Sequence, residues 1–360
     1  MTLFGGFSLP RRLALGFKPS RTPGLLWITL GLLLGPASSN VIPSAVLARL
    51  DPVVSMALAV LGAFVGSGFV THGRAPASVA GAIGQASVTV LGVAAAMWFL
   101  LTQWQMTLAV EVTVAALILG LCSAGSAAIH TQEPASPDMM RAATLADLDD
   151  VPIIIAASIA IPWLGVVTDT WITLGVAVGA ALTIGVAGLL LLSRADSTAE
   201  RGVVVTGTLL LLSGAAAYIT TSPLTAGLVA GMLWQRQMRA ATPTSTHIER
   251  LQHPLLALLL IAAGASLQFS WALVWITAPL VLVRLSSKTV GGMLVSPLVR
   301  VSPGLASAAL VPPGILGIAL AFNFQQVLGS GGTILLSAVT VSTMLSEVLA
   351  RTVLSAEEVA

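Results

Sequence analysis

Twelve predominantly apolar segments follow one another along the chain, and most are about long enough to cross a lipid bilayer as a helix. A spanning helix needs about 20 mostly apolar residues, and Pro, Gly and charged residues mark the ends of each segment. The expected spans are 24–37, 52–70, 77–101, 106–129, 143–167, 171–193, 202–220, 222–235, 254–269, 271–295, 304–328 and 331–350. The pattern predicts an all-α polytopic membrane protein with about 12 transmembrane helices surrounded by membrane lipids.

The composition supports this class and excludes others. Charged residues make up 8% of the chain and hydrophobic residues 56%, whereas soluble domains carry roughly 25% charged residues. No cluster of Lys and Arg of the kind that binds nucleic acid is present. The single cysteine, Cys122, excludes an internal disulfide and matches no metal-ligand spacing. We therefore expect no nucleic-acid partner and no cofactor.

The distribution of Lys and Arg predicts the orientation of the chain. If the N-terminus is cytoplasmic, 13 of the 16 basic residues fall on the inside and only Arg49 falls outside, with Arg284 and Lys288 inside the tenth span. Cytoplasmic loops carry such an excess. We expect a multi-pass protein of the cell (inner) membrane with both termini cytoplasmic. Residues 1–23 form a basic cytoplasmic segment, 24–354 the transmembrane domain and 355–360 a short cytoplasmic tail.

Two adjacent carboxylates, Asp149 and Asp150, open the apolar stretch of the fifth span. An ionisable residue at the centre of a membrane helix costs at least about 2.5 kcal/mol and usually has a function. Neighbouring residues point about 100° apart on a helix, so one carboxylate can line a cavity while the other reaches a partner helix. Two buried carboxylates repel, so one is expected to hold a proton or a cation near neutral pH. The alternative is that the pair only caps the N-terminus of its helix.

Two cations at membrane depth, Arg284 and Lys288, need counter-charges. Their spacing of four residues places them on one face of the tenth span. The acidic residues expected at similar depth are the aspartate pair and Glu347. The alternative for Lys288 is that its side chain extends to the membrane interface.

Two spans appear interrupted, because 119–130 is rich in Gly, Ser and Ala and 311–326 contains two prolines and a glycine. Broken helices at corresponding places in two halves indicate a transporter site, although small residues also serve helix packing. The residues expected to line these breaks are Ser123, Ser126, Gly314, Asn323 and Gln326.

Several stretches together resemble the monovalent cation:proton antiporter superfamily, which has the sodium/hydrogen exchanger fold. The resemblance covers most of the chain in order, and no single motif is specific. The stretches are LGLLLGP (30–36), LDDVPIIIAASI (148–159), SPLTAGLVAGML (222–233), LLIAAGASLQFS (259–270), VLVRLSSKTVGG (281–292), PPGILGIALAFNFQQVLG (312–329) and VTVSTMLSEVLA (339–350).

The resemblance implies inverted repeats with two broken helices that cross, and a core around 106–167 and 254–328 that moves against a scaffold or dimerisation domain. It implies that Asp150 binds the transported cation and the proton. Asp149 would pair with Lys288 or Arg284. It further implies electrogenic exchange, which accompanies a double aspartate in this family, and a homodimer. A regulatory domain would have to come from a separate subunit.

The sequence therefore predicts a secondary antiporter that exchanges protons for sodium or potassium by alternating access. A cation channel and a sodium-coupled symporter of organic anions stay open as alternatives. Enzymes are disfavoured, because an intramembrane aspartyl protease needs its two aspartates on separate helices. A zinc protease needs a His-Glu-x-x-His motif, and the four histidines are scattered.

Overall fold

The computed structural model describes residues 17–18, 24–72, 76–106, 108–126, 130–131, 136–164, 170–219, 221–237 and 243–359. Nearly all of these residues are helical. The helices are α1 (Gly24–Leu34), α2 (Ser44–Arg49), α3 (Asp51–His72), α4 (Pro76–Gln103), α5 (Val112–Ser123), α6 (Pro137–Leu148), α7 (Asp150–Leu164), α8 (Thr170–Arg194), α9 (Thr198–Tyr218), α10 (Pro223–Gln237), α11 (Pro243–Ala265), α12 (Trp271–Val299), α13 (Pro303–Leu310), α14 (Leu316–Leu328), the 3₁₀ helix η1 (Gly329–Gly332) and α15 (Thr333–Val359). Two short strands, β1 (Phe17–Lys18) and β2 (His130–Thr131), pair antiparallel.

The helices confirm an all-α polytopic membrane protein. Each predicted span overlaps a described helix or an interrupted pair of helices. In the described part of the chain, 6 stretches are long and apolar enough to cross a membrane, and three shorter apolar helices accompany them. Of the expected N-terminal segment 1–23, only 17–18 lies within the described residues, and α15 continues through most of the expected tail to Val359.

The fifth span begins earlier than the sequence predicted. The hydroxyl of Ser136 accepts a hydrogen bond from the backbone N–H of Met139, and Pro137 occupies the first turn of α6, as is typical of a helix start. Asp149 follows the 12 residues of α6 and keeps a right-handed helical backbone. Because α6 and α7 run on almost without interruption, the aspartate pair lies inside the span. Asp150 lies in the first turn of α7, but the pair does not cap the cytoplasmic end of the span, because α6 precedes it.

The helices α3 and α10 pack with their backbones in close contact. A Cβ added to Gly62 would lie 1.9 Å from the carbonyl oxygen of Leu224, and one added to Gly227 would lie 1.9 Å from that of Ala59. Small residues of this kind let membrane helices approach closely.

A second pair, α1 and α11, is packed in the same way. A Cβ on Gly31 would lie 2.1 Å from the carbonyl oxygen of Ile261, and one on Gly264 would lie 2.0 Å from that of Ile28. The contact between α3 and α10 thus has a counterpart in the contact between α11 and α1. This is expected if the chain contains two repeats in which α3 corresponds to α11 and α10 to α1.

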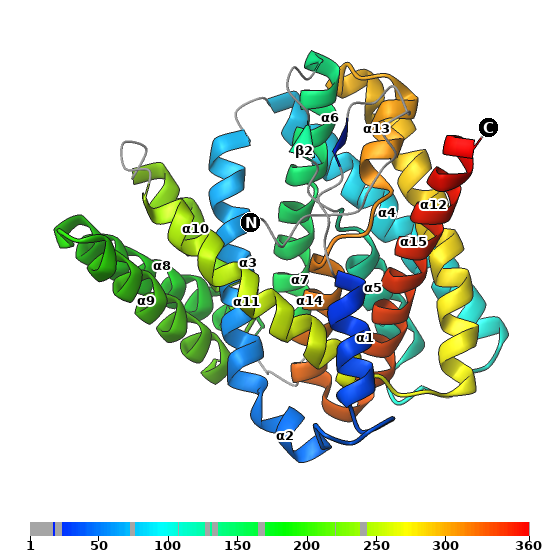
Figure 1. Cartoon of the computed structure of the whole chain (residues 1–360), viewed down its shortest axis with the longest axis horizontal. Helices are drawn as coiled ribbons and strands as arrows, with labels where there is room; N and C mark the ends of the chain where they lie inside the picture. The colour runs from blue at the N-terminus through cyan, green and yellow to red at the C-terminus, as the bar shows by residue number, and fades with distance from the viewer. Residues whose placement is uncertain are drawn as a thin grey trace.

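The two interrupted helices lie between these pairs and α4 and α12. Figure 1 shows α8 and α9 projecting on one side of the molecule, α4 and α12 at the opposite edge, and α5, α7 and α14 in the middle. The helix α5 ends at Ser123, and α13 and α14 are separated between Leu310 and Leu316. An isolated antiparallel bridge joins Ser126 to Pro313. Both predicted breaks are confirmed, and the two extended segments meet at this bridge.

Candidate functional site

A fully buried ion pair lies beside the bridge between the two broken helices. The Nζ atom of Lys288 lies 2.7 Å from Oδ2 of Asp149, and both side chains have 0% exposure. The hydroxyl of Ser126 donates to the same Oδ2 at 2.7 Å and accepts from Lys288 Nζ at 2.7 Å. Lys288 also donates to the backbone carbonyl of Ala124. Three acceptors therefore surround the ammonium group, as a buried charge requires.

Arg284 lies one turn before Lys288 on α12 and has a different set of partners. Its Nε donates to the carbonyl of Ser123 at 3.1 Å and its Nη2 to that of Gly125 at 3.2 Å. Its Nη1 donates to the carbonyl of Val311 at 3.4 Å, across the second break. Carbonyls at the end of a helix lack intrahelical partners and carry partial negative charge. Arg284 therefore compensates the two interruptions, and Lys288 is the partner of Asp149.

The other member of the pair, Asp150, begins α7 and lies against the first break. Its Oδ1 atom is buried and accepts no hydrogen bond from the described residues, and the same holds for Oδ1 of Asp149. A Cβ on Gly125 would lie 3.1 Å from Asp150 Oδ1 and 3.3 Å from Cβ of Leu316. The glycine thus allows the broken segment, the carboxylate and the first residue of α14 to come together.

The charges in this cluster do not balance. Asp147 was not expected as a site residue, but it lies one turn before Asp150 and interacts electrostatically with both members of the pair. Three described carboxylates and two cations, Lys288 and Arg284, therefore belong to this cluster, which carries one net negative charge if all are ionised. Asp149 is buried, whereas Asp147 and Asp150 are half-buried. A net charge that is shielded from water to this extent is costly. The cluster is suited to hold one additional positive charge, either a proton or a cation.

The remaining residues predicted for the breaks divide into two groups. Ser123 supplies a carbonyl to Arg284, and Ser126 takes part in the ion-pair cluster. Gly314 lies in the interruption between α13 and α14. Two polar residues of α14 are placed elsewhere. The amide of Asn323 donates to Ser222, and that of Gln326 donates to Ser55 at 3.1 Å. These hydrogen bonds join α14 to α3 and to the residue that precedes α10, and neither involves the aspartate pair.

Glu347 is also buried away from the ion pair. The side chain is 2% exposed on α15, and a Cβ on Gly24 would lie 4.0 Å from its Oε2. It therefore lies beside the first residue of α1, where the N-terminal end of a helix favours negative charge. Neither Arg284 nor Lys288 donates a hydrogen bond to it among the described contacts.

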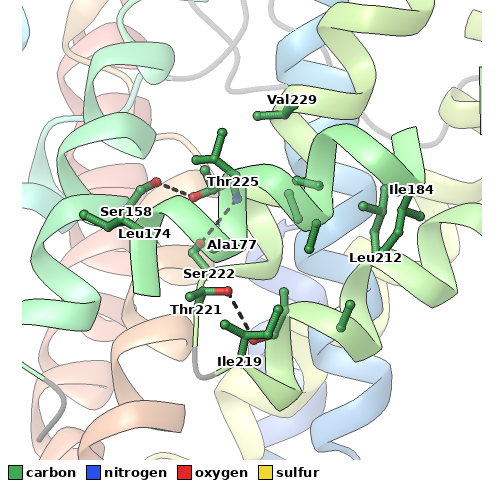
Figure 2. Close-up of a pocket in the computed structure, with 16 residues that line it drawn as sticks. Ser158, Leu174, Ala177, Ile184, Leu212, Ile219, Thr221, Ser222, Thr225 and Val229 are labelled. Atoms are coloured by element: carbon green, nitrogen blue, oxygen red, sulfur yellow. Dashed lines mark hydrogen bonds between the residues drawn. The ribbon is translucent and has the colours of Figure 1, made fainter. Parts of the chain in front are cut away.

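A small pocket lies farther along α7, between α7, α8, α9 and α10. Its polar wall is shown in Figure 2, where the hydroxyls of Ser158 and Thr225 point toward each other and Ser222 lies next to Thr225. The cavity measures about 50 Å³ and its other lining residues are mostly apolar. Neither aspartate lines it. The pocket instead marks a polar contact that joins α7 to α10.

Sequence reasoning found both aspartates, both cations and both breaks. It missed the backbone carbonyls that Arg284 and Lys288 use, because a sequence does not show which peptide groups lose their helical partners. It also left Asp147 aside. Its spacing of three residues from Asp150 is the signal that could have placed it on the same helix face.

Comparison with known proteins identifies the fold. No profile of a known protein family matches the sequence, and no curated protein sequence matches it. Among solved structures, the sodium proton antiporter MjNhaP1 from Methanocaldococcus jannaschii, determined at pH 8, matches with a TM-score of 0.63 and 17% sequence identity. The match covers 91% of this chain and 92% of that chain. The sodium/hydrogen exchanger-type fold that the sequence suggested is therefore confirmed.

Proposed function

We propose that this chain, which has the fold of a sodium/proton antiporter, is a transporter that exchanges protons for a monovalent cation, sodium or potassium. The observation that carries the proposal is the buried Asp149–Lys288 ion pair at the crossing of two broken helices, with Asp150 beside it and forming no salt bridge with a described residue.

Asp150 is proposed to hold either a proton or the transported cation. Asp149 is already neutralised by Lys288, which leaves Asp150 as the carboxylate that can change its occupant. Carboxylate, hydroxyl and carbonyl oxygens are the ligands that hard cations prefer, and the crossing supplies all three kinds. Competition for one carboxylate, together with alternating exposure to the two sides, couples the two flows. The paired aspartates support electrogenic exchange through their resemblance to the antiporter superfamily.

Alternating access requires two groups of helices that move against each other. We assign α5–α7 and α12–α15, which carry the breaks and the ion pair, to the core. We assign α1–α3, α10 and α11 to the scaffold, in which α1, α3, α10 and α11 pack through their glycines. Compared with the core around 106–167 and 254–328 that the resemblance implies, this moves residues 254–265 of α11 to the scaffold and adds α15 to the core. The charge distribution supports two cytoplasmic termini and a cell-membrane location. A homodimer and a separate regulatory subunit remain predictions.

The test is exchange in liposomes that contain the purified protein and a pH-sensitive dye. With an inward-acidic gradient, external sodium or potassium should dissipate the gradient, and Asp150→Asn should abolish this. Ser302→Ala, at an exposed position outside the crossing, serves as the matched control. Dissipation that persists in Asp150→Asn would contradict the proposal, as would a cation-independent proton leak of the same size in the original protein.

A further inference from the structure

A large cavity opens between the proposed core and scaffold, on the side of α2 and η1. It has a volume of about 760 Å³, whereas one water molecule takes up about 30 Å³. One wall is formed by α2 and the start of α3, and the opposite wall by the end of α14, η1 and the start of α15. The end of α11 and the connection to α12 close the third side. Because the charge distribution places the α1–α2 connection outside, the cavity is expected to open to the exterior, and we refer to it as the outer vestibule.

The chemistry of the outer vestibule favours cations. Asp51 is the one ionisable side chain among its described lining residues. Amide and hydroxyl groups, including those of Gln325, Ser266 and Thr333, supply further oxygen atoms. Arg49 lies close in sequence but does not line the cavity. A cavity with one carboxylate and no cation on its walls raises the local concentration of cations, and its size admits a cation with its water shell.

The floor of the outer vestibule is apolar. Following α3, α11 and α14 away from the outer side, the innermost lining residues are Val54, Ala262 and Phe322, which are 5%, 3% and 6% exposed. Phe322 lies six residues beyond Leu316, which corresponds to about 9 Å along the helix. Leu316 is the residue that meets Gly125 next to Asp150. The vestibule therefore ends about 9 Å short of the crossing, measured along α14.

On the outer side of this floor, Gln326 links the wall formed by α14 to the wall formed by α3. Its amide donates to Ser55 of α3 at 3.1 Å. A residue that the sequence placed at the lining of the second broken helix thus contributes to the boundary between core and scaffold.

We propose that the outer vestibule is the external entrance for the transported cation, that Asp51 concentrates the cation there, and that Val54, Ala262 and Phe322 close it from Asp150 in this conformation. The inference rests on the proposed exchange function for the identity of the cation. The cavity, its single carboxylate and its apolar floor do not depend on that function.

The first test measures access of water-soluble reagents and requires no transport. Cys122 is the only cysteine of the sequence and is buried, so Cys122→Ala provides a cysteine-free background. In this background, Gln325→Cys lines the vestibule, whereas Val327→Cys is half-buried on the same helix and does not line it. A membrane-impermeant maleimide added to intact cells should label Gln325→Cys at least tenfold faster. Equal rates, or labelling only in inverted membrane vesicles, would overturn the proposed external entrance.

The second test measures external cation dependence in the transport assay. Asp51→Asn should raise the KM for external sodium or potassium about threefold at low ionic strength, and the difference should shrink in high salt. Glu111→Gln, which removes an exposed carboxylate outside the vestibule, should leave this KM unchanged. An unchanged KM in Asp51→Asn would overturn the role of Asp51. If no exchange is measured but Gln325→Cys is labelled selectively, the exchange function fails and the water-filled vestibule stands. If exchange occurs without selective labelling, the vestibule alone fails.

Discussion

The arrangement of Asp149, Lys288 and Ser126 shows how a pair of charges is held inside this membrane protein. Both charged side chains are fully buried and the lysine donates to three acceptors. A buried pair gains little over an apolar pair of the same shape, but removal of one partner leaves an uncompensated charge. In the pair Arg141–Asp138 the side chains are 48% and 53% exposed, so water solvates either charge when its partner is removed. Neither charge of the buried pair can therefore be removed alone without a loss of stability.

Removal of the lysine charge alone should therefore lower the stability of the protein. Lys288→Met leaves Asp149 buried and unpaired, so the free energy of unfolding should fall by about 3–5 kcal/mol. The double variant Lys288→Met, Asp149→Asn should recover most of the loss, because neither member of the pair then carries a charge. Thermal unfolding in detergent measures both. Arg141→Met is the control and should change stability by less than about 1 kcal/mol. If Lys288→Met is as stable as the control, the buried carboxylate of Asp149 does not depend on Lys288.

At the scale of the elements, the breaks depend on groups supplied by other helices. The interruption after α5 leaves carbonyls without helical partners, and α12 supplies Arg284 and Lys288 to them. The paired helices of the scaffold, α3 with α10 and α1 with α11, are uninterrupted and pack closely through glycines. Close glycine contacts are not confined to the scaffold, because a Cβ on Gly317 of α14 would lie 2.3 Å from the carbonyl oxygen of Cys122 on α5. The breaks therefore add hydrogen bonds from α12 to a glycine packing that both groups of helices share.

The contact between α3 and α10 should not tolerate a methyl group. Gly62→Ala would place a Cβ 1.9 Å from a backbone oxygen of α10, so the two helices must separate. We expect the free energy of unfolding to fall by about 1–3 kcal/mol, measured by thermal unfolding in detergent. At Gly207 of α9, no atom lies within 4 Å of an added Cβ. Gly207→Ala should therefore leave stability unchanged or raise it by up to about 1 kcal/mol. Equal losses in the two variants would refute close packing at Gly62.

At the scale of the whole molecule, the proposed core and scaffold share one buried apolar cluster, and a few polar contacts also cross their boundary. Gln326 of α14 bonds to Ser55 of α3, and Ser158 of α7 bonds to Thr225 of α10. Hydrogen bonds between membrane helices average about 0.6 kcal/mol. Hydrogen bonds of this strength stabilise one arrangement of core and scaffold but are weak enough to break if the arrangement changes. We therefore expect these polar contacts to break more readily than the contacts of the charged centre.

A covalent bond across this boundary should stop exchange. The pair Ser55→Cys, Gln326→Cys in the Cys122→Ala background places thiols where two side chains now share a 3.1 Å hydrogen bond. Oxidation to the disulfide should lower the exchange rate at least tenfold in proteoliposomes, and a reductant should restore it. The single-cysteine variants should be insensitive to oxidant. Full exchange with the disulfide formed would show that α3 and α14 need not move apart.

The sequence was sufficient for features that depend on composition along one helix. The spans follow from hydropathy, and the shared face of Arg284 and Lys288 follows from their spacing of four residues. The choice between these two cations could not be predicted, because it depends on where the carbonyls of two distant breaks lie. The start of α6 at Pro137 was missed, because its first turns are polar. The partners of Asn323 and Gln326 could not be predicted, because Ser222 and Ser55 lie far away in the sequence.

The central claim is that one carboxylate, Asp150, holds either a proton or a monovalent cation. The most direct measurement is proton release when sodium or potassium is added to the purified protein in weakly buffered detergent. We expect release of up to about one proton per chain, at a pH where the cluster holds it, and none from Asp150→Asn. Equal release from the two proteins, or none from the original protein at any pH at which it exchanges cations, would show that Asp150 does not hold the exchanged proton.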